Sequence, residues 1–183
     1  MPPEMIPSNC PYCGNGLGHR THEGVERLYC ESCERFIWRN PAPVAAVIVY
    51  RETGEVLLIK RGIEPGKGKW SLPAGFLEIE ESAREAAARE LNEETNLKTD
   101  SKDLDYVHDL NIERFEDQRL LANIYSVHYS DVEGDLEPGS DAEDAGFYSL
   151  EELKDSGQEL RTNFVPALKR LEEIDLSALN INS

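Results

Sequence analysis

The feature that most constrains this 183-residue sequence is a run of glutamates that follows a glycine loop, between Gly75 and Leu97. Its alanines are strong helix formers, and a helix advances about 100° per residue. Glu90, Glu93 and Glu94 stand at i, i+3 and i+4, so their carboxylates share one face of the expected helix. Because like charges at such distances repel one another, this face needs a compensating partner.

One of these glutamates is directed at the protein interior. In helical projection, Glu94 falls within the apolar stripe that Ala83, Ala87 and Leu91 form. A buried carboxylate is unfavourable unless it is paired or bound to a metal ion. Two interpretations are open at this point. One is a solvated acidic helix face, which is the common outcome for a run of charges, and the other is a site for divalent cations.

The spacing favours the second interpretation, because it resembles the box of Nudix hydrolases. That pattern is Gly, five residues, Glu, seven residues, then Arg-Glu-apolar-x-Glu-Glu-x-Gly-apolar. The matching residues, all in register, are Gly75, Glu81, Arg89, Glu90, Leu91, Glu93, Glu94 and Leu97. The single departure is Asn96, which stands where the family has its last glycine. A helix end in the left-handed region is expected there, and Asn tolerates that region best after Gly.

The resemblance covers roughly residues 43–175 and implies an α/β fold, with an α/β/α sandwich around a mixed β-sheet. It also implies a site for Mg²⁺ or Mn²⁺. By the family's pattern, Glu90, Glu93 and Glu94 would be the metal ligands, joined by the carbonyl of Gly75. Hard oxygen ligands of this kind suit divalent ions that neutralise charge during phosphoanhydride hydrolysis.

Two further residues receive roles from the same resemblance: Arg89 would orient the ligand carboxylates, and Glu81 would support the site. Glu90 is the better candidate for the general base or the principal metal ligand, and the sequence does not apportion these two roles. Many family members recruit another acidic residue from a later loop. Here Glu143 and its neighbour Asp144 occupy such a segment, and Glu143 is the candidate we name. No substrate-binding residue is assigned.

The first 33 residues hold two Cys-x-x-Cys pairs, formed by Cys10, Cys13, Cys30 and Cys33. Paired knuckles at this spacing predict a structural zinc site. About thirty residues cannot bury enough apolar surface to fold alone, so a bound metal would supply the missing stability. Iron on the same thiolates and a redox pair are the alternatives, but a redox motif sits in a βαβ context that this segment lacks.

We therefore expect a small zinc ribbon over residues 1–39 and a Nudix hydrolase domain over residues 40–183, joined by a proline-containing segment. In the second part, a continuous apolar run predicts a strand that is covered on both faces. The expected strands are 44–50, 56–60, 104–112, 119–129 and 146–148. Three helices are expected: the box helix from about 80–82 to 96, a second helix capped by Ser149 and Glu152, and a last helix marked by Phe164, Leu168, Leu171 and Ile174. Residues 176–183 are expected to form a loose tail.

Charge and hydropathy limit the partners. Lys and Arg number 19 and Asp and Glu 36, which gives a formal net charge of −17 without a basic stripe. This argues against a nucleic-acid partner. A phosphate-bearing substrate would be repelled unless metal ions reverse the local charge. No apolar run reaches the length of a membrane span, and the N-terminus lacks signal-peptide character, so we expect a cytoplasmic protein without a membrane partner.

The leading hypothesis is a magnesium-dependent enzyme that acts on a small nucleotide-derived substrate. It would hydrolyse the phosphoanhydride of a nucleoside diphosphate linked to another moiety, such as FAD or ADP-ribose, and release two monophosphates. The alternatives are an NADH or nucleoside triphosphate pyrophosphatase, and a non-hydrolytic Nudix ligand sensor. The Ser-Gln-Pro-Trp-Pro-Phe-Pro-type signature of the NADH branch is absent downstream. A homodimer is common in the family and is possible here.

Overall fold

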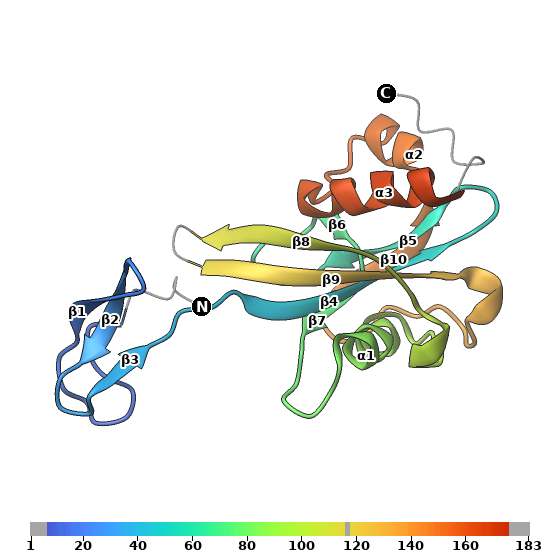
Figure 1. Ribbon diagram of the computed structural model, residues 1–183. Coiled ribbons are helices and arrows are strands. Elements are labelled where there is room, and N and C mark those ends of the chain that lie inside the picture. The colour runs from blue at the N-terminus through green and yellow to red at the C-terminus, as the bar shows by residue number, and fades with distance from the viewer. Residues whose placement is uncertain (1–6, 116–117, 176–183) are drawn as a thin grey trace. The chain divides into compact units, whose positions relative to one another are not determined.

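The computed structural model describes residues 7–115 and 118–175, and the chain divides into two compact units (Figure 1). The first comprises the residues up to Ala42 together with Glu113–Leu120, and the second comprises Pro43–Ile112 and the residues from Leu121 onwards. The expected domain boundary at residues 39/40 stays a prediction, because compactness does not show that either part folds independently. The expected tail at residues 176–183 lies outside the described residues.

The first unit is built on a small antiparallel sheet with the strand order β1-β2-β3. The strands are β1 (Gly18–His22), β2 (Val25–Cys30) and β3 (Arg35–Ile37). The end of β2 is buried, including Leu28 and Tyr29. None of these three strands is among those expected from the sequence, because charged residues interrupt the apolar alternation that would indicate a strand.

The second unit is organised by a sheet with the order β10-β5-β4-β9-β8, in which β6 pairs with β5 and β7 pairs with β4. Its strands are β4 (Ala42–Tyr50), β5 (Val56–Arg61), β6 (Trp70–Ser71), β7 (Ala74–Phe76), β8 (Asp105–Phe115), β9 (Gln118–His128) and β10 (Ala142–Tyr148). β5 is antiparallel to β4 and to β10. β4 and β9 run in the same direction in Figure 1, so the sheet is mixed, as expected.

Strand β4 is buried from Val44 to Val49. Successive side chains of a strand point to opposite faces, so both faces of the sheet must be covered here. Helix α1 (Ala83–Thr95) covers one face, and α2 (Leu150–Asp155) and α3 (Val165–Asp175) cover the other (Figure 1). The expected α/β/α sandwich is therefore confirmed.

Short 3-10 helices and a helix cap are the remaining features of the described part of the second unit. The 3-10 helices are η1 (Ser101–Asp103), η2 (Tyr129–Asp131) and η3 (Thr162–Phe164). Ser149 and Glu152 form the expected capping box, because each side chain accepts the other's backbone N–H. Of the residues expected to mark the last helix, Phe164 and Leu168 are buried, while the side chains of Leu171 and Ile174 lie outside the described part of the chain. None of the helices in the described residues has the length and apolar character that crossing a bilayer requires.

Trp70, which stands just before the glycine loop, is a core residue. It is 2% exposed, and its ring packs edge-on against Tyr148 with a centroid separation of 4.7 Å. Its indole N–H donates to the side chain of Gln158, and its backbone N–H donates to the carbonyl of Glu159 at 2.8 Å. These contacts hold the chain after α2 alongside β6.

Candidate metal-dependent active site

Helix α1 begins and ends at the residues that its sequence favours. Ser82 is the N-cap, and it forms a capping box with Glu85: each side chain accepts the backbone N–H of the other residue. This pairing provides acceptors for two backbone N–H groups at the helix start, which have no acceptor within the helix. Asn96 ends the helix in the left-handed region, with φ of 59°. The expectation that Asn replaces Gly here for a conformational reason is confirmed.

Glu94 points into the protein, as the helical projection predicted. Only 2% of the residue is exposed, and its Oε2 accepts the backbone N–H of Ala74 at 2.9 Å. Burial raises the pKa of Glu94 to about 9, although the hydrogen bond from Ala74 opposes the rise. A carboxylate in this position is costly in its ionised form, and a bound cation is a means of compensating it.

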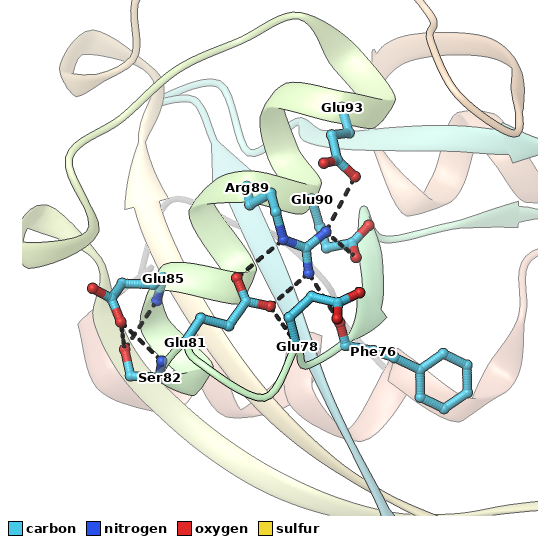
Figure 2. A network of polar contacts seen from close by, with 8 residues as sticks. All are labelled: Phe76, Glu78, Glu81, Ser82, Glu85, Arg89, Glu90 and Glu93. Carbon is cyan, nitrogen blue, oxygen red and sulfur yellow. Dashed lines mark hydrogen bonds and ion pairs between the residues drawn. The ribbon is translucent and has the colours of Figure 1, made fainter.

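Arg89 gathers the other acidic side chains of the box (Figure 2). Its guanidinium donates to Glu81 at 2.7 and 3.0 Å, to Glu90 at 2.7 Å, to Glu93 at 3.1 Å and to the carbonyl of Phe76 at 2.9 Å. Glu90 and Glu93 share one nitrogen, Nη1, so Arg89 holds their carboxylates close together. Hydrogen bonding to Arg89 lowers the pKa of Glu81.

Gly75 lets the carboxylate of Glu90 approach the backbone of β7. A Cβ atom at this position would lie 1.9 Å from Oε1 of Glu90, so the Glu90 carboxylate would have to move. The glycine that opens the sequence pattern therefore leaves room for the Glu90 carboxylate, which any larger residue at this position would displace. Glu90 is itself largely buried, with a side chain 13% exposed.

A carboxylate from outside the box, that of Asp141, joins this cluster. Burial raises the pKa of Glu90 most, the nearby charges of Glu93 and Asp141 raise it further, and Arg89 opposes them. Asp141 also raises the pKa of Glu94, through its charge and a side-chain hydrogen bond, beyond the larger effect of burial. On its other side, Oδ2 of Asp141 lies 3.8 Å from Nη2 of Arg61.

Glu143 is the loop acid expected from the sequence, but Asp141 is the one that interacts with Glu90 and Glu94. Glu143 is exposed and lies at a β-bulge, where the register between β10 and β5 shifts between Ala142 and Asp144. The backbone of Asp141 is fixed by a hydrogen bond from the N–H of Gly62 to its carbonyl, at 2.7 Å. Both acids belong to one acidic segment, and no spacing rule distinguishes them before the bulge is known.

The four cysteines converge in the first unit. All four sulfurs lie within 4.8 Å of one another, with 3.9 Å between Cys10 and Cys33 and 3.6 Å between Cys13 and Cys30. Tetrahedral zinc with Zn–S bonds of about 2.3 Å requires sulfurs about 3.8 Å apart, so the donor set fits zinc. Burial raises the pKa of the Cys10 thiol, but backbone hydrogen bonds from Tyr12 and Cys13, together with side-chain hydrogen bonds from Cys30 and Cys13, bring it to about 7. Burial raises the pKa of Cys30, and hydrogen bonding to Cys13 raises that of Cys33, so without a metal the cluster favours a thiolate at Cys10 and not at all four positions.

Taken with the α/β/α sandwich, a helix of clustered carboxylates beside a glycine loop defines a class of protein: a hydrolase that uses divalent metal ions on phosphate substrates. Residues 40–168 match the NUDIX domain, so the chain belongs to the Nudix family and is a Nudix pyrophosphohydrolase. Enzymes of this family use divalent metals such as Mg²⁺ or Mn²⁺ and act on small nucleotide-derived substrates.

Known relatives agree with this membership. An ADP-ribose pyrophosphatase from Methanocaldococcus jannaschii is 34% identical over 119 residues, which cover 64% of this chain and 67% of that protein. The NAD-capped RNA hydrolase NudC of Pseudomonas aeruginosa is 30% identical over 145 residues, 79% of this chain and 48% of NudC. Other curated relatives are matched over about a third of their length (31% and 32%). The crystal structure of a NUDIX hydrolase from Nitrosomonas europaea shares 27% identity and a TM-score of 0.66, with 91% of each chain covered.

Proposed function

We propose that this Nudix pyrophosphohydrolase cleaves the phosphoanhydride of a nucleoside diphosphate linked to another moiety, with ADP-ribose or FAD as substrate, and releases two monophosphates. The observation that carries the proposal is the intact carboxylate cluster: Glu90 and Glu93 held by Arg89, and Glu94 directed inward beside Asp141. A ligand sensor would not need to keep this costly arrangement. The ADP-ribose pyrophosphatase of Methanocaldococcus jannaschii supports the choice of substrate.

Each residue of the cluster has a distinct task in this proposal. Glu90, Glu93 and Glu94 would hold Mg²⁺ or Mn²⁺, with the carbonyl of Gly75 completing the set. When bound, the ions neutralise charge on the phosphate oxygens and lower the pKa of a bound water. Arg89 keeps the Glu90 and Glu93 carboxylates in position, and its geometry fits this orienting role.

Glu81 supports the cluster indirectly. It accepts both a backbone N–H from Glu78, at 2.8 Å, and two hydrogen bonds from Arg89, so it fixes the guanidinium against the glycine loop. Charge-assisted, bidentate pairs of this kind are the geometrically specific ones. Glu81 thus positions Arg89 and need not touch the substrate.

We assign the loop carboxylate of the site to Asp141, in place of the earlier candidate Glu143. Asp141 faces both Glu90 and Glu94, whereas Glu143 is exposed at the bulge. We expect Asp141→Asn to lower kcat by tenfold or more and Glu143→Gln to change it less than twofold. The reverse order in steady-state assays would return the role to Glu143.

The reaction class is tested by the double variant Glu93→Gln, Glu94→Gln. Loss of the two metal ligands should lower turnover of ADP-ribose and FAD by at least three orders of magnitude in the presence of Mg²⁺. Glu151→Gln, at an exposed position of α2, is the control and should retain full activity. Circular dichroism would verify that the double variant is folded, and equal turnover in wild type and double variant would refute the proposal.

A second candidate substrate is NADH or NAD⁺. The 30% identity to a NudC named as an NAD-capped RNA hydrolase favours it, over 79% of this chain. A screen of ADP-ribose, FAD, NADH and nucleoside triphosphates with Mg²⁺ and with Mn²⁺ separates the candidates by kcat/KM. A preference of at least tenfold for NADH would replace the ADP-ribose and FAD assignment.

A further inference from the structure

A positively charged cavity lies outside the carboxylate cluster. It has a volume of about 340 Å³ and is bounded on one side by Lys60, Lys67 and Lys69, and on the other by residues 156–159. Ligand cavities typically hold about 300–1,000 Å³, so this one suits a small ligand. We call it the lysine cavity.

The concentration of positive charge is unusual for this chain. Three of the seven lysines in the sequence line the lysine cavity. In the whole sequence, by contrast, acidic residues outnumber basic residues by 36 to 19. Lys69 pairs with Glu159 at 2.6 Å. Among the residues that the structure describes, Lys60 and Lys67 have no hydrogen-bond or ion-pair partner, even though Lys60 is half-buried. Two unpaired ammonium groups beside a cavity favour an anion.

The lysine cavity lies on the face of the sheet opposite to the carboxylate cluster. Side chains alternate along β5, so Lys60 and Arg61 point to opposite faces. Arg61 reaches Asp141 on the side of the cluster, whereas Lys60 pairs in register with Trp70. An anion beside Lys60 is therefore not bound to the metal ligands of α1. On β10, Asp144 pairs in register with Lys60 but does not line the cavity.

The far wall of the lysine cavity is held by hydrogen bonds. Gln158 donates its backbone N–H to the carbonyl of Leu153 at 3.2 Å, and its side chain accepts the indole N–H of Trp70. Arg161 donates its backbone N–H to the carbonyl of Trp70 at 2.8 Å. A wall fixed in this way is already formed before a ligand arrives, which reduces the entropy cost of binding.

From these observations we propose that the lysine cavity binds a small phosphate-bearing anion, separately from the substrate phosphates at the carboxylate cluster. Lys60 and Lys67 supply the charge that pairs with the phosphate. Lys69 is already partnered by Glu159 and contributes to the positive potential around it. Ammonium groups bind phosphate as point charges, so the site recognises charge more than the orientation of the anion.

Binding is measured by titration calorimetry in magnesium-free buffer, which keeps the carboxylate cluster from taking part through a metal. The probes are inorganic pyrophosphate and AMP. The double variant Lys60→Gln, Lys67→Gln should bind the better probe at least tenfold more weakly than wild type. The control variant Lys98→Gln, Lys102→Gln removes two exposed lysines elsewhere and should bind it as wild type does. Equal affinity in all three proteins, or no binding of either probe, overturns the proposal.

The two probes also distinguish the sources of phosphate. Tighter binding of AMP would identify a nucleotide ligand, and tighter binding of pyrophosphate an inorganic one. An NMR titration locates the site independently, because the two tryptophans report on different parts of the chain. The indole N–H signal of Trp70 should move, since its acceptor Gln158 lines the lysine cavity, and that of Trp38 should not. A shift of the Trp38 signal alone would place the anion elsewhere and contradict the assignment.

Discussion

A single side chain, Glu94, concentrates the electrostatic cost of the site. Glu94 is 2% exposed, and its carboxylate accepts one backbone N–H from Ala74 and interacts with two further carboxylates, those of Glu90 and Asp141. The cluster therefore disfavours a negative charge on Glu94 when no cation is bound. A strongly raised carboxyl pKa of this kind is typical of functional sites, where a protein gives up stability for chemistry.

This cost predicts how the magnesium-free protein responds to pH. The pKa of Glu94 is raised from its ordinary value of 4.5 to about 9 in the folded state. The folded state then holds a proton that the unfolded chain releases, so stability from this group is complete below about pH 4.5 and falls as pH rises towards 9. At pH 7 the raised pKa of Glu94 lowers the free energy of unfolding by an amount on the order of 3 kcal/mol, relative to its value below pH 4.5. Glu94→Gln should abolish this loss of stability and raise the melting temperature in magnesium-free buffer at pH 7–8.

Thermal unfolding between pH 5 and 8 measures the effect. Glu93→Gln is the matched control, since the Glu93 side chain is 49% exposed and its loss should leave the pH dependence unchanged. A melting temperature that falls in Glu94→Gln, at every pH, would show that the Glu94 carboxylate is not penalised in the folded protein.

The contact between Gly75 and Glu90 gives a second prediction at the residue scale. In Gly75→Ala the new Cβ would lie 1.9 Å from Oε1 of Glu90, so the carboxylate must move away from β7. We expect kcat to fall at least a hundredfold, because misplacement by about 1 Å at a reacting centre costs about that much. Gly18→Ala is the control, because a Cβ there meets no atom within 4 Å. Full activity in Gly75→Ala would mean that the position of Glu90 is not critical.

At the scale of elements, helix α1 is fixed at both ends before it presents its carboxylates. The capping box of Ser82 and Glu85 fixes the start. At the other end, the loop that precedes β10 donates hydrogen bonds to the last carbonyls of the helix. The backbone N–H of Gly139 donates to the carbonyl of Glu94 at 3.0 Å, and the backbone N–H of Glu137 donates to the carbonyl of Thr95 at 3.0 Å. The same loop continues into Asp141. One segment therefore both caps the end of the helix and positions the Asp141 carboxylate beside the glutamates.

Removal of the N-cap should weaken the helix without touching the chemistry. Ser82→Ala is expected to lower the free energy of unfolding by about 1 kcal/mol, because a backbone N–H of the first turn loses its acceptor. Ser82→Thr, which retains the cap, should lie close to wild type. Denaturant unfolding measures the first effect, and kcat at a temperature well below the transition should be unchanged. A large drop in kcat for Ser82→Ala would show that the helix start moves the carboxylates.

At the scale of the whole molecule, the two metal chemistries lie in different units. Soft thiolates gather in the first unit, and hard carboxylates gather in the second. Donor softness separates the metals, since thiolates select zinc and carboxylates select magnesium or manganese. Four cysteines would fill all the ligand positions of a zinc ion in the first unit, so we expect such an ion to have a structural role.

We predict one zinc ion per chain in protein purified without chelator, measured by elemental analysis. Cys13→Ser combined with Cys30→Ser should reduce zinc to well below one per chain and lower the stability of the first unit, because a structural zinc supplies folding free energy. Wild-type protein that is folded and free of zinc would contradict the prediction, as would iron in place of zinc.

Features set by local geometry were predictable from the sequence. Helical periodicity directs Glu94 inward and groups Glu90 and Glu93 on the same helix, whatever else surrounds them. The conformational tolerance of Asn96 is equally local, and its left-handed backbone follows from residue type. The spacing of the cysteine pairs is likewise a short-range pattern, and it is the sulfurs of those pairs that converge.

The remaining features depend on contacts between residues far apart in the chain, and only the tertiary structure decides them. Asp141 reaches the glutamate cluster because a β-bulge and the pairing of β10 with β5 fix its position, and Glu143, two residues on, does not. The lysine cavity forms where the chain after α2 lies along Trp70. The sequence by itself therefore determined the class of reaction, through the spacing of carboxylates on one helix. Strand register, which no local pattern encodes, decided the loop carboxylate and the second site.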